Sequence, residues 1–203
     1  MHKILLLILF GTVFQSISSE EINSENLFNF LNEKQFLEAK FTQTTYLNSR
    51  DRIIKGTIKA TRGGLFKLDY LEPIQETISA DKRFLYKLDI ELEQLDIVPR
   101  EEYFKDTPIN IFITKTGDID KLYLIDSCTN DNKLTICALS PKDKDSFVEK
   151  LFLKFLKTDL KSLSYLDSFG QLVELEFEEI SWKPFPVSQL LIEVPEGIDV
   201  VYH

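Results

Sequence analysis

Most of the chain alternates between short apolar or β-branched runs and clusters of turn-forming residues. From Ala39 onward these runs recur at roughly ten-residue spacing, and pairs such as Gly63-Gly64 and Glu72-Pro73 separate them. The pattern predicts an antiparallel β meander that continues, after a less regular middle segment, into the second half of the chain. The expected strands are Lys40–Asn48, Ile53–Thr61, Leu65–Tyr70, Gln75–Ser79, Phe84–Leu88, Leu92–Val98, Leu122–Ser127, Leu134–Leu139, Glu149–Lys157, Lys161–Leu166, Leu172–Ser181 and Leu190–Val194.

Two segments have the periodicity of helices instead. Residues 22–38 carry apolar side chains near helical spacing. Further along, Asp106 stands before Thr107-Pro108 and the apolar residues 109–113, and an Asp cap with Pro in the first turn marks a short helix. The fold class is therefore mainly β, with little helix.

The strands differ in how clearly one face is polar. In residues 172–182 the acidic side chains Glu174, Glu176 and Glu178 share one face, and apolar side chains share the other, whereas residues 147–156 are apolar on both faces. The dry face of a sheet must be covered, and the two helices supply only about 25 residues of cover. With 16 Phe, 7 Tyr and 1 Trp, the chain fits either an aromatic-rich core or an open apolar groove. The pattern leaves both possibilities open.

The first residues predict a secretory signal peptide. A short basic start at His2 and Lys3 precedes the apolar run from Ile4 to Phe10, and small residues follow at Ser16 and Ser18. We expect cleavage after Ser18, a signal peptide over residues 1–18, and one secreted domain over residues 19–203; an uncleaved anchor is the alternative. No cysteine lies near the end of the apolar run, so we expect no acylation of the chain itself.

The two cysteines favour a structural disulfide. A turn at Asn132-Lys133 would set Cys128 opposite Cys137 in a hairpin, within bridging distance, and an oxidising compartment preserves such a bond. Two buried free thiols are the alternative. A redox site is not expected, because the sequence has no Cys-x-x-Cys pair.

Composition argues for binding without catalysis. The formal net charge is −9, and an acidic chain lacks the basic face that nucleic-acid binding normally requires. The only histidines are His2 and His203, at the two ends of the chain, which removes His-dependent triads and most transition-metal sites from the body of the domain. There is also no Gly-x-Ser-x-Gly and no glycine-rich phosphate loop. We therefore expect no catalytic residue, no metal and no cofactor.

Several motifs resemble those of the outer-membrane lipoprotein carrier (LolA) family. The run Phe36–Gln43 resembles the passage from first helix to first strand, and Arg62, Gly64 and Phe66 match the pattern Arg-Pro-Gly-x-Phe-x-Trp. Gly63 replaces the Pro of that pattern, and Leu68 replaces its Trp.

Further matches keep the same order along the chain. Residues 89–94 resemble the family's Asp-Pro-x-Leu-Glu-Gln, with Ile90 in place of Pro. Thr107-Pro108 stands where the family has Thr-Pro before a lid helix, and residues 192–200 resemble its closing Phe-x-Pro-x-Gly-Val-Asp-Val. The matches span about 160 residues, so the order and spacing of many weak motifs carry the resemblance.

The resemblance implies an unclosed antiparallel half-barrel with helices covering its concave face. It also implies a monomeric periplasmic chaperone that shelters the acyl chains of lipoproteins. Such a carrier takes its cargo from an inner-membrane ABC transporter and delivers it to an outer-membrane acceptor, which is itself a lipoprotein. The absence of an acylation cysteine favours carrier over acceptor.

The resemblance also assigns roles to residues. Arg62 is expected to gate the lid by binding backbone carbonyls of the lid helix; a solvated Arg before the Gly-Gly turn is the alternative. The expected groove residues are the apolar side chains of the matching strands and of the lid. They are Phe41, Leu65, Phe66, Leu68, Phe84, Tyr86, Leu92, Ile111 and Phe112.

Two rival functions stay open on sequence alone. Periplasmic sensors of hydrophobic or lipidated ligands reuse this half-barrel without transporting a cargo. A hydrolase on an open barrel is the other rival, since acidic pairs such as Glu101-Glu102 are present.

Overall fold

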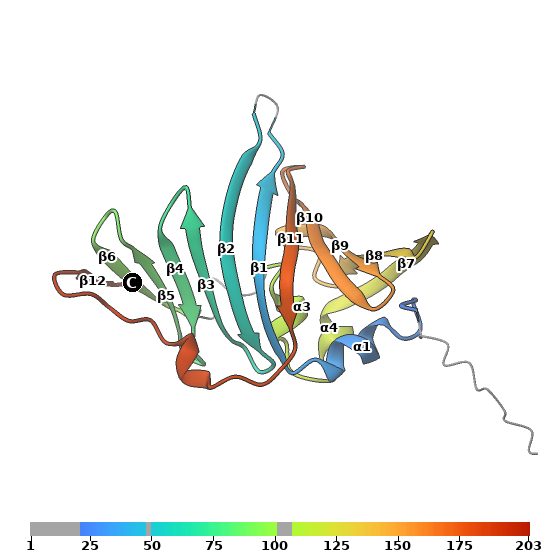
Figure 1. Cartoon of the computed structure of the whole chain (residues 1–203), viewed down its shortest axis with the longest axis horizontal. Coiled ribbons are helices and arrows are strands. Elements are labelled where there is room, and N and C mark those ends of the chain that lie inside the picture. Colours follow the sequence, from blue (N-terminus) through green and yellow to red (C-terminus); the bar gives the residue numbers. More distant parts are fainter. Residues whose placement is uncertain (1–20, 48–49, 101–106) are drawn as a thin grey trace, which may run out of the picture.

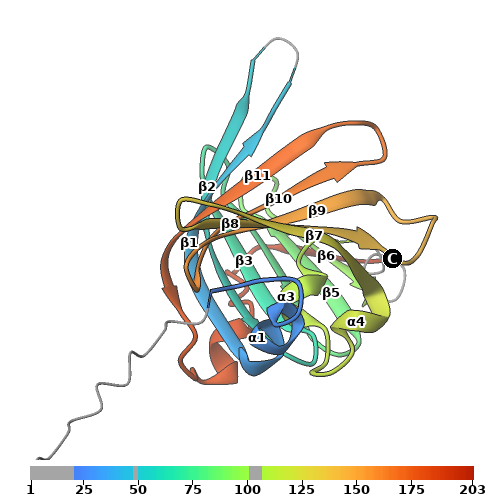
Figure 2. The same cartoon turned by 90° about the vertical axis from the view of Figure 1, so that its right-hand side faces the viewer.

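A single curved β-sheet forms the body of the protein, and short helices lie against its concave face (Figure 1; Figure 2). The computed structural model describes residues 21–47, 50–100 and 107–203, so the expected signal peptide falls outside the described residues. The elements in chain order are α1 (Leu27–Glu33), β1 (Phe36–Thr45), β2 (Arg52–Thr61), β3 (Leu65–Glu72), β4 (Glu76–Ala80), β5 (Phe84–Asp89), β6 (Gln94–Pro99), α3 (Asn110–Ile113), α4 (Ile119–Leu122), β7 (Tyr123–Asp131), β8 (Leu134–Pro141), β9 (Val148–Leu156), β10 (Asp159–Asp167), β11 (Leu172–Ser181), the 3-10 helix η1 (Val187–Leu190) and β12 (Asp199–Tyr202).

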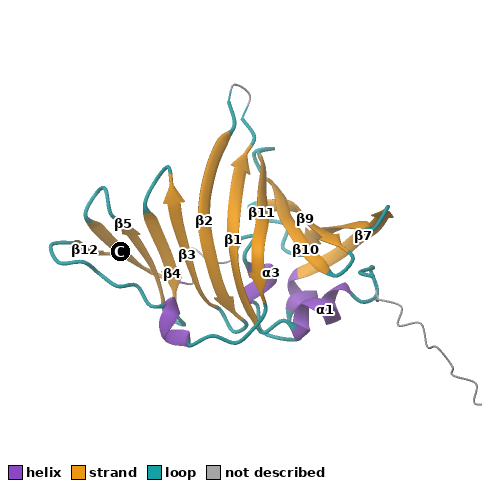
Figure 3. Cartoon of the chain, in the orientation of Figure 1, coloured by secondary structure: helices purple, strands orange, loops and turns teal. Residues whose placement is uncertain are grey.

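The sheet has 12 strands in the order β12-β6-β5-β4-β3-β2-β1-β11-β10-β9-β8-β7. Neighbouring strands are antiparallel, except that β12 runs parallel to β6. Within the described part of the chain, β12 and β7 each have a strand neighbour on one side only, so the sheet does not close into a barrel. The predicted unclosed, mainly antiparallel half-barrel with helices on its concave face is confirmed (Figure 3).

The main core lies between the concave face and the helices. Inward side chains of the central strands, such as Leu37 of β1 and Phe155 of β9, join Leu27 and Leu31 of α1 and Ile111 of α3 in one buried cluster. The Phe30 ring of α1 meets the Phe155 ring edge-on at 5.7 Å between centroids. The helices are short, and packing of their apolar faces stabilises them more than their intrinsic propensity does.

The first helix is shorter than the predicted span of residues 22–38. It ends at Glu33, and residues Phe36–Ala39 already belong to β1, where they pair with residues 58–61 of β2. The apolar spacing near Phe36 fits a helix and a strand equally well, and the ladder to β2 selects the strand.

The last predicted strand, Leu190–Val194, is wrong. Val187–Leu190 forms η1, and the final strand is Asp199–Tyr202, beside β6. The apolar side chains of residues 187–194 instead lie over the convex face of the sheet: Leu190 is buried, and its carbonyl accepts a hydrogen bond from Ser79 Oγ at 2.6 Å.

A disulfide bond joins Cys128 of β7 to Cys137 of β8. The two residues face each other directly in the ladder, with Cα atoms 4.0 Å apart, and Cys137 is fully buried. The bond links the two strands of the outermost hairpin covalently, and β7 has only one neighbour among the described strands.

Among the described residues, no helix combines the length and hydrophobicity that a membrane-spanning helix requires.

The disulfide predicts a measurable loss of stability when it is removed. The double variant C128S/C137S should lose roughly 2–3 kcal/mol of unfolding free energy, because a short covalent loop no longer restricts the unfolded chain. Urea unfolding followed by circular dichroism measures the change. Reduced wild-type protein is the control and should unfold at the same urea concentration as the variant; an unchanged midpoint in both would contradict the stabilising role.

Candidate functional site

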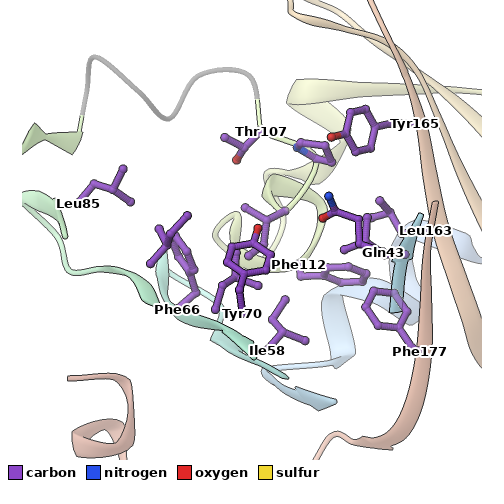
Figure 4. Close-up of a pocket in the computed structure, with 15 residues that line it drawn as sticks. Gln43, Ile58, Phe66, Tyr70, Leu85, Thr107, Phe112, Leu163, Tyr165 and Phe177 are labelled. Atoms are coloured by element: carbon purple, nitrogen blue, oxygen red, sulfur yellow. The ribbon is translucent and has the colours of Figure 1, made fainter. Parts of the chain in front are cut away.

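An apolar cavity of about 260 Å³ lies between the concave face of the sheet and the segment that leads into α3 (Figure 4). Side chains of the central strands form its floor and walls, and residues 107–112 form its cover. The lining residues are Gln43, Ile58, Phe66, Leu68, Tyr70, Ile78, Leu85, Thr107, Pro108, Ile109, Phe112, Leu163, Tyr165, Leu175 and Phe177.

Strand alternation explains why these side chains share one face. The ladder places Phe66 opposite Ala60 and Ala80, and Leu68 opposite Ile58 and Ile78, so these residues point to the same side of the sheet. The floor of the cavity is therefore a continuous apolar surface made by strands that are neighbours in space.

A glycine gives the floor its shape where β1, β2 and β3 meet. Gly56 pairs with both Phe41 and Tyr70, and the rings of Phe41 and Tyr70 meet edge-on at 5.8 Å between centroids. A Cβ at position 56 would lie 2.7 Å from the Phe41 ring and 2.3 Å from the Asp69 carbonyl oxygen. The missing side chain lets the Phe41 ring lie across β2.

The few polar lining side chains of the strands lie toward one end of the cavity. Gln43, Tyr70 and Tyr165 each stand two residues before the end of their strand, on β1, β3 and β10. Burial raises the pKa of Tyr70 to about 12, so its phenol is neutral at physiological pH. The cavity therefore combines a dry interior with an uncharged polar margin, as sites for apolar ligands commonly do.

Arg62, the residue that directly follows β2, binds backbone carbonyls of the segment that covers the cavity and of the end of α1. Its Nη1 donates to the carbonyl oxygens of Ile111 at 2.8 Å and Thr114 at 3.2 Å, at α3. Its Nη2 donates to the Leu31 carbonyl at 2.7 Å and its Nε to the Lys34 carbonyl at 3.1 Å, at the end of α1. One guanidinium thus joins the carboxyl ends of two helices to the edge of the cavity, and the negative ends of their dipoles suit its charge.

Burial of Arg62 does not remove its charge. Desolvation lowers the pKa of the guanidinium to about 10, still well above neutral pH. A half-buried cation must be satisfied by acceptors, and the four carbonyl oxygens supply them. Loss of these contacts would leave either an unpaired charge or exposed carbonyls.

The structure brings together only part of the predicted groove. Phe66, Leu68 and Phe112 line the cavity, and the Phe112 ring meets Phe177 of β11 edge-on at 6.1 Å between centroids. Phe41 and Ile111 do not line it. Both are buried in the core, Phe41 on β1 beside the Tyr70 ring and Ile111 in α3.

Four predicted groove residues lie elsewhere, which corrects the prediction. Leu65 and Tyr86 line a hollow on the convex face, beneath residues 187–194. Phe84 packs with Tyr86 and with Ile192 in a separate convex cluster. Leu92 stands in the turn between β5 and β6 with 72% of its surface exposed.

The sequence of β5 does not show which of its side chains face the cavity. Residues 84–86 are all apolar, because Leu85 faces the cavity while Phe84 and Tyr86 face the C-terminal segment. Alternation identifies the inner face only where the other face is polar, and here neither is. By contrast, the acidic alternation of β11 correctly separates Leu175 and Phe177, which line the cavity, from its glutamates. Those two residues could have been named from sequence.

Metal binding finds no support in the described part of the chain, where no group of three or more His, Cys, Asp or Glu side chains could hold an ion. The shape of the cavity and its apolar lining are the features that could select a ligand.

Comparison with known proteins finds one matching family over most of the chain. The family model described as "Outer membrane lipoprotein carrier protein LolA" matches residues 32–189. The outer-membrane lipoprotein carrier protein of Hahella chejuensis is 29% identical over 195 residues, which cover 92% of this chain and 91% of that protein. The carrier protein of Legionella pneumophila is 28% identical over 205 residues, 98% of this chain and 96% of that protein.

A solved structure supports the fold independently of sequence. The crystal structure of an uncharacterized conserved protein from Thermus thermophilus aligns with a TM-score of 0.57 at 14% identity, covering 88% of this chain and 98% of that one.

The buried phenol at the cavity margin predicts an alkaline weakening of the fold. Tyr70 stays protonated in the folded state up to a pH of about 12, whereas the unfolded chain loses the proton near pH 10, so stability falls as the pH rises above 10. The variant Tyr70→Phe should show a shallower decline over this window, by up to about 1.4 kcal/mol per pH unit. Urea unfolding at stepped pH measures it. Tyr202→Phe, at an exposed position, is the control, and identical slopes in Tyr70→Phe and wild type would contradict the burial argument.

Proposed function

This chain belongs to the outer membrane lipoprotein carrier (LolA) family, and we propose that it shelters the acyl chains of lipoproteins in its concave cavity as they cross the periplasm. The observation that carries the proposal is the apolar cavity between the half-barrel and a lid held by one residue, Arg62. The described residues that line it include no charged side chain, which favours hydrocarbon over a polar ligand. The proposed activity is binding and transfer, without catalysis.

The size of the cavity supports a lid that moves. Small-molecule pockets typically have ~300–1,000 Å³, and the acyl chains of one lipoprotein need more room than about 260 Å³. Cargo entry therefore requires that residues 107–113 withdraw from the sheet. Phe112 and Ile109 then expose the apolar surface that the cargo covers in their place.

Competition between lid and cargo makes transfer reversible. Each methylene buried contributes about 0.8 kcal/mol, so a long acyl chain in a rigid open groove would be held too firmly to be passed on. A lid that returns to the same surface offsets part of that energy, because the empty protein gains packing and hydrogen bonds when it closes. In this scheme the contacts of Arg62 set how strongly the closed state competes.

The family relationship extends the proposal to partners and location. We propose that residues 1–18 direct secretion and that residues 19–203 act as a single-domain, monomeric carrier in the periplasm. The carrier would receive its cargo from an inner-membrane ABC transporter and hand it to an outer-membrane acceptor. The names of the relatives support lipoprotein as the cargo class.

Narrowing the cavity tests the binding site directly. Ile78 lines the cavity, so Ile78→Trp should weaken binding of a fluorescent fatty acid about tenfold or more, since a bulkier floor displaces at least two methylenes of the ligand. The matched control is Leu65→Trp, on the neighbouring strand β3 but facing the convex side. Equal affinities for the two variants would place the ligand outside the concave cavity.

Removing the lid anchor tests the transfer mechanism. Arg62→Leu should take up cargo normally but release it poorly, because charge-assisted hydrogen bonds contribute about 1.5–3 kcal/mol each and their loss weakens the closed, empty state. We expect at least tenfold slower transfer of a purified lipoprotein to acceptor vesicles.

The control for this experiment is Arg83→Leu, which removes an exposed arginine from the turn between β4 and β5. It should transfer cargo at the wild-type rate. Normal transfer by Arg62→Leu would contradict the proposed role of the anchor while leaving the cavity as the binding site.

A further inference from the structure

One end of the half-barrel carries a group of exposed apolar side chains. They lie next to the ends of β1 and β10 and at the starts of β2, β9 and β11, and they include Phe169, with 86% of its surface exposed, and Ile53, with 53%. We call this set the rim band: Tyr46, Leu47, Ile53, Phe147, Phe169 and Leu172. Scattered exposed apolar residues are ordinary, but a group at one end of the molecule indicates a contact surface.

The members of the rim band are physically joined. The backbone N–H of Tyr46 donates to the Leu172 carbonyl at 3.0 Å, which ties the end of β1 to the start of β11. Tyr46, Leu47 and Phe169 line one shallow hollow. The rings of Phe147 and Phe169 meet edge-on at 6.1 Å between centroids, which extends the band to the strand β9.

The rim band borders the end of the concave cavity that faces away from the helices. Gln43, Tyr70 and Tyr165, the polar lining residues of the strands, point to this end, each two residues short of the end of its strand. Arg62 and the helices α1 and α3 lie toward the opposite end (Figure 2). A hydrocarbon chain that passes the margin of the cavity at this end would meet the rim band next.

The charge of the neighbouring segment differs from that of the whole chain. Between Tyr46 and Lys55 there are three basic side chains, Arg50, Arg52 and Lys55, and one acidic side chain, Asp51, although the chain carries −9 overall. Arg50 and Arg52 are exposed, and Lys55 forms a 4.0 Å ion pair with an exposed glutamate of β3. A locally basic hairpin beside aromatic side chains matches an anionic bilayer surface, where aromatic rings settle at the level of the headgroups.

We propose that the rim band docks the carrier on the surface of an anionic phospholipid bilayer, with the open end of the cavity against the membrane. The inference rests on the proposed carrier function. An acyl chain that moves between bilayer and cavity is least exposed to water when the two apolar regions adjoin, so a carrier benefits from a mouth that contacts the interface. The contact is peripheral and reversible, because it involves a few side chains at loop ends.

Vesicle flotation tests the docking surface without any cargo. Protein purified from the periplasm of a secreting host and stripped of lipid is mixed with vesicles of phosphatidylcholine containing phosphatidylglycerol. We expect the wild type to float with these vesicles, and less with pure phosphatidylcholine or in high salt, which screens the basic hairpin. The variant L47E/F169E should lose about tenfold or more of the bound fraction, since two apolar side chains no longer enter the interface.

A matched variant and a second measurement keep the test decisive. Leu191→Glu replaces another leucine, 64% exposed, in the C-terminal segment after η1, and it should float like the wild type. Binding of a fluorescent fatty acid in solution should be unchanged in all three proteins, which shows that each variant is folded. Wild-type protein that fails to float, or that floats no better than L47E/F169E, overturns the docking proposal. Loss of fatty-acid binding in the wild type would instead contradict the carrier function itself.

Discussion

The contact between one half-buried guanidinium and the ends of two short helices holds the cover over the cavity. Arg62 satisfies carbonyls of Leu31 and Lys34 at the end of α1 and of Ile111 and Thr114 at α3. Helices of four to seven residues are not stable alone in water, and these persist because they pack on the sheet and because their free carbonyls meet a positive charge. The cover of the cavity is therefore held by a small number of local hydrogen bonds that all involve one side chain.

In the proposed mechanism, this arrangement lets the protein bind hydrocarbon firmly and still release it. Ile109 and Phe112 cover the apolar floor of the half-barrel, and we propose that cargo takes their place in the loaded state. The difference between two large burial energies is small, so a few hydrogen bonds at Arg62 suffice to shift the balance. In the proposed mechanism, burial of the cargo against the sheet supplies the binding free energy, and closure of the lid in the empty protein offsets part of it.

Different parts of the chain pack on the two faces of the sheet. The concave face holds the core and the cavity, while the C-terminal segment packs across the convex face of β3 to β6 and ends in a strand parallel to β6. That segment covers apolar residues that would otherwise be exposed and protects one edge of an unclosed sheet. At the other edge, the disulfide between β7 and β8 fixes the outermost hairpin. An open half-barrel needs such devices, because closure would remove the concave surface that receives a ligand.

Patterns along the chain were sufficient for the strand-rich fold class, for the hairpin register that sets Cys128 opposite Cys137, and for the inward face of β11, where glutamates alternate with apolar residues. The resemblance to the carrier family, and not the pattern, drew attention to Arg62 and to three residues that line the cavity, Phe66, Leu68 and Phe112.

Three other features could be identified only from the tertiary structure. Phe36 begins a strand, and residues 187–194 cover the convex face of the sheet. On β5, Leu85 faces the cavity and its neighbours do not. Hydrophobic periodicity reports that a residue is buried, but it does not identify the partner that buries it. Where both faces of a strand are covered, or where helix and strand periods coincide over a few residues, long-range packing alone makes the choice.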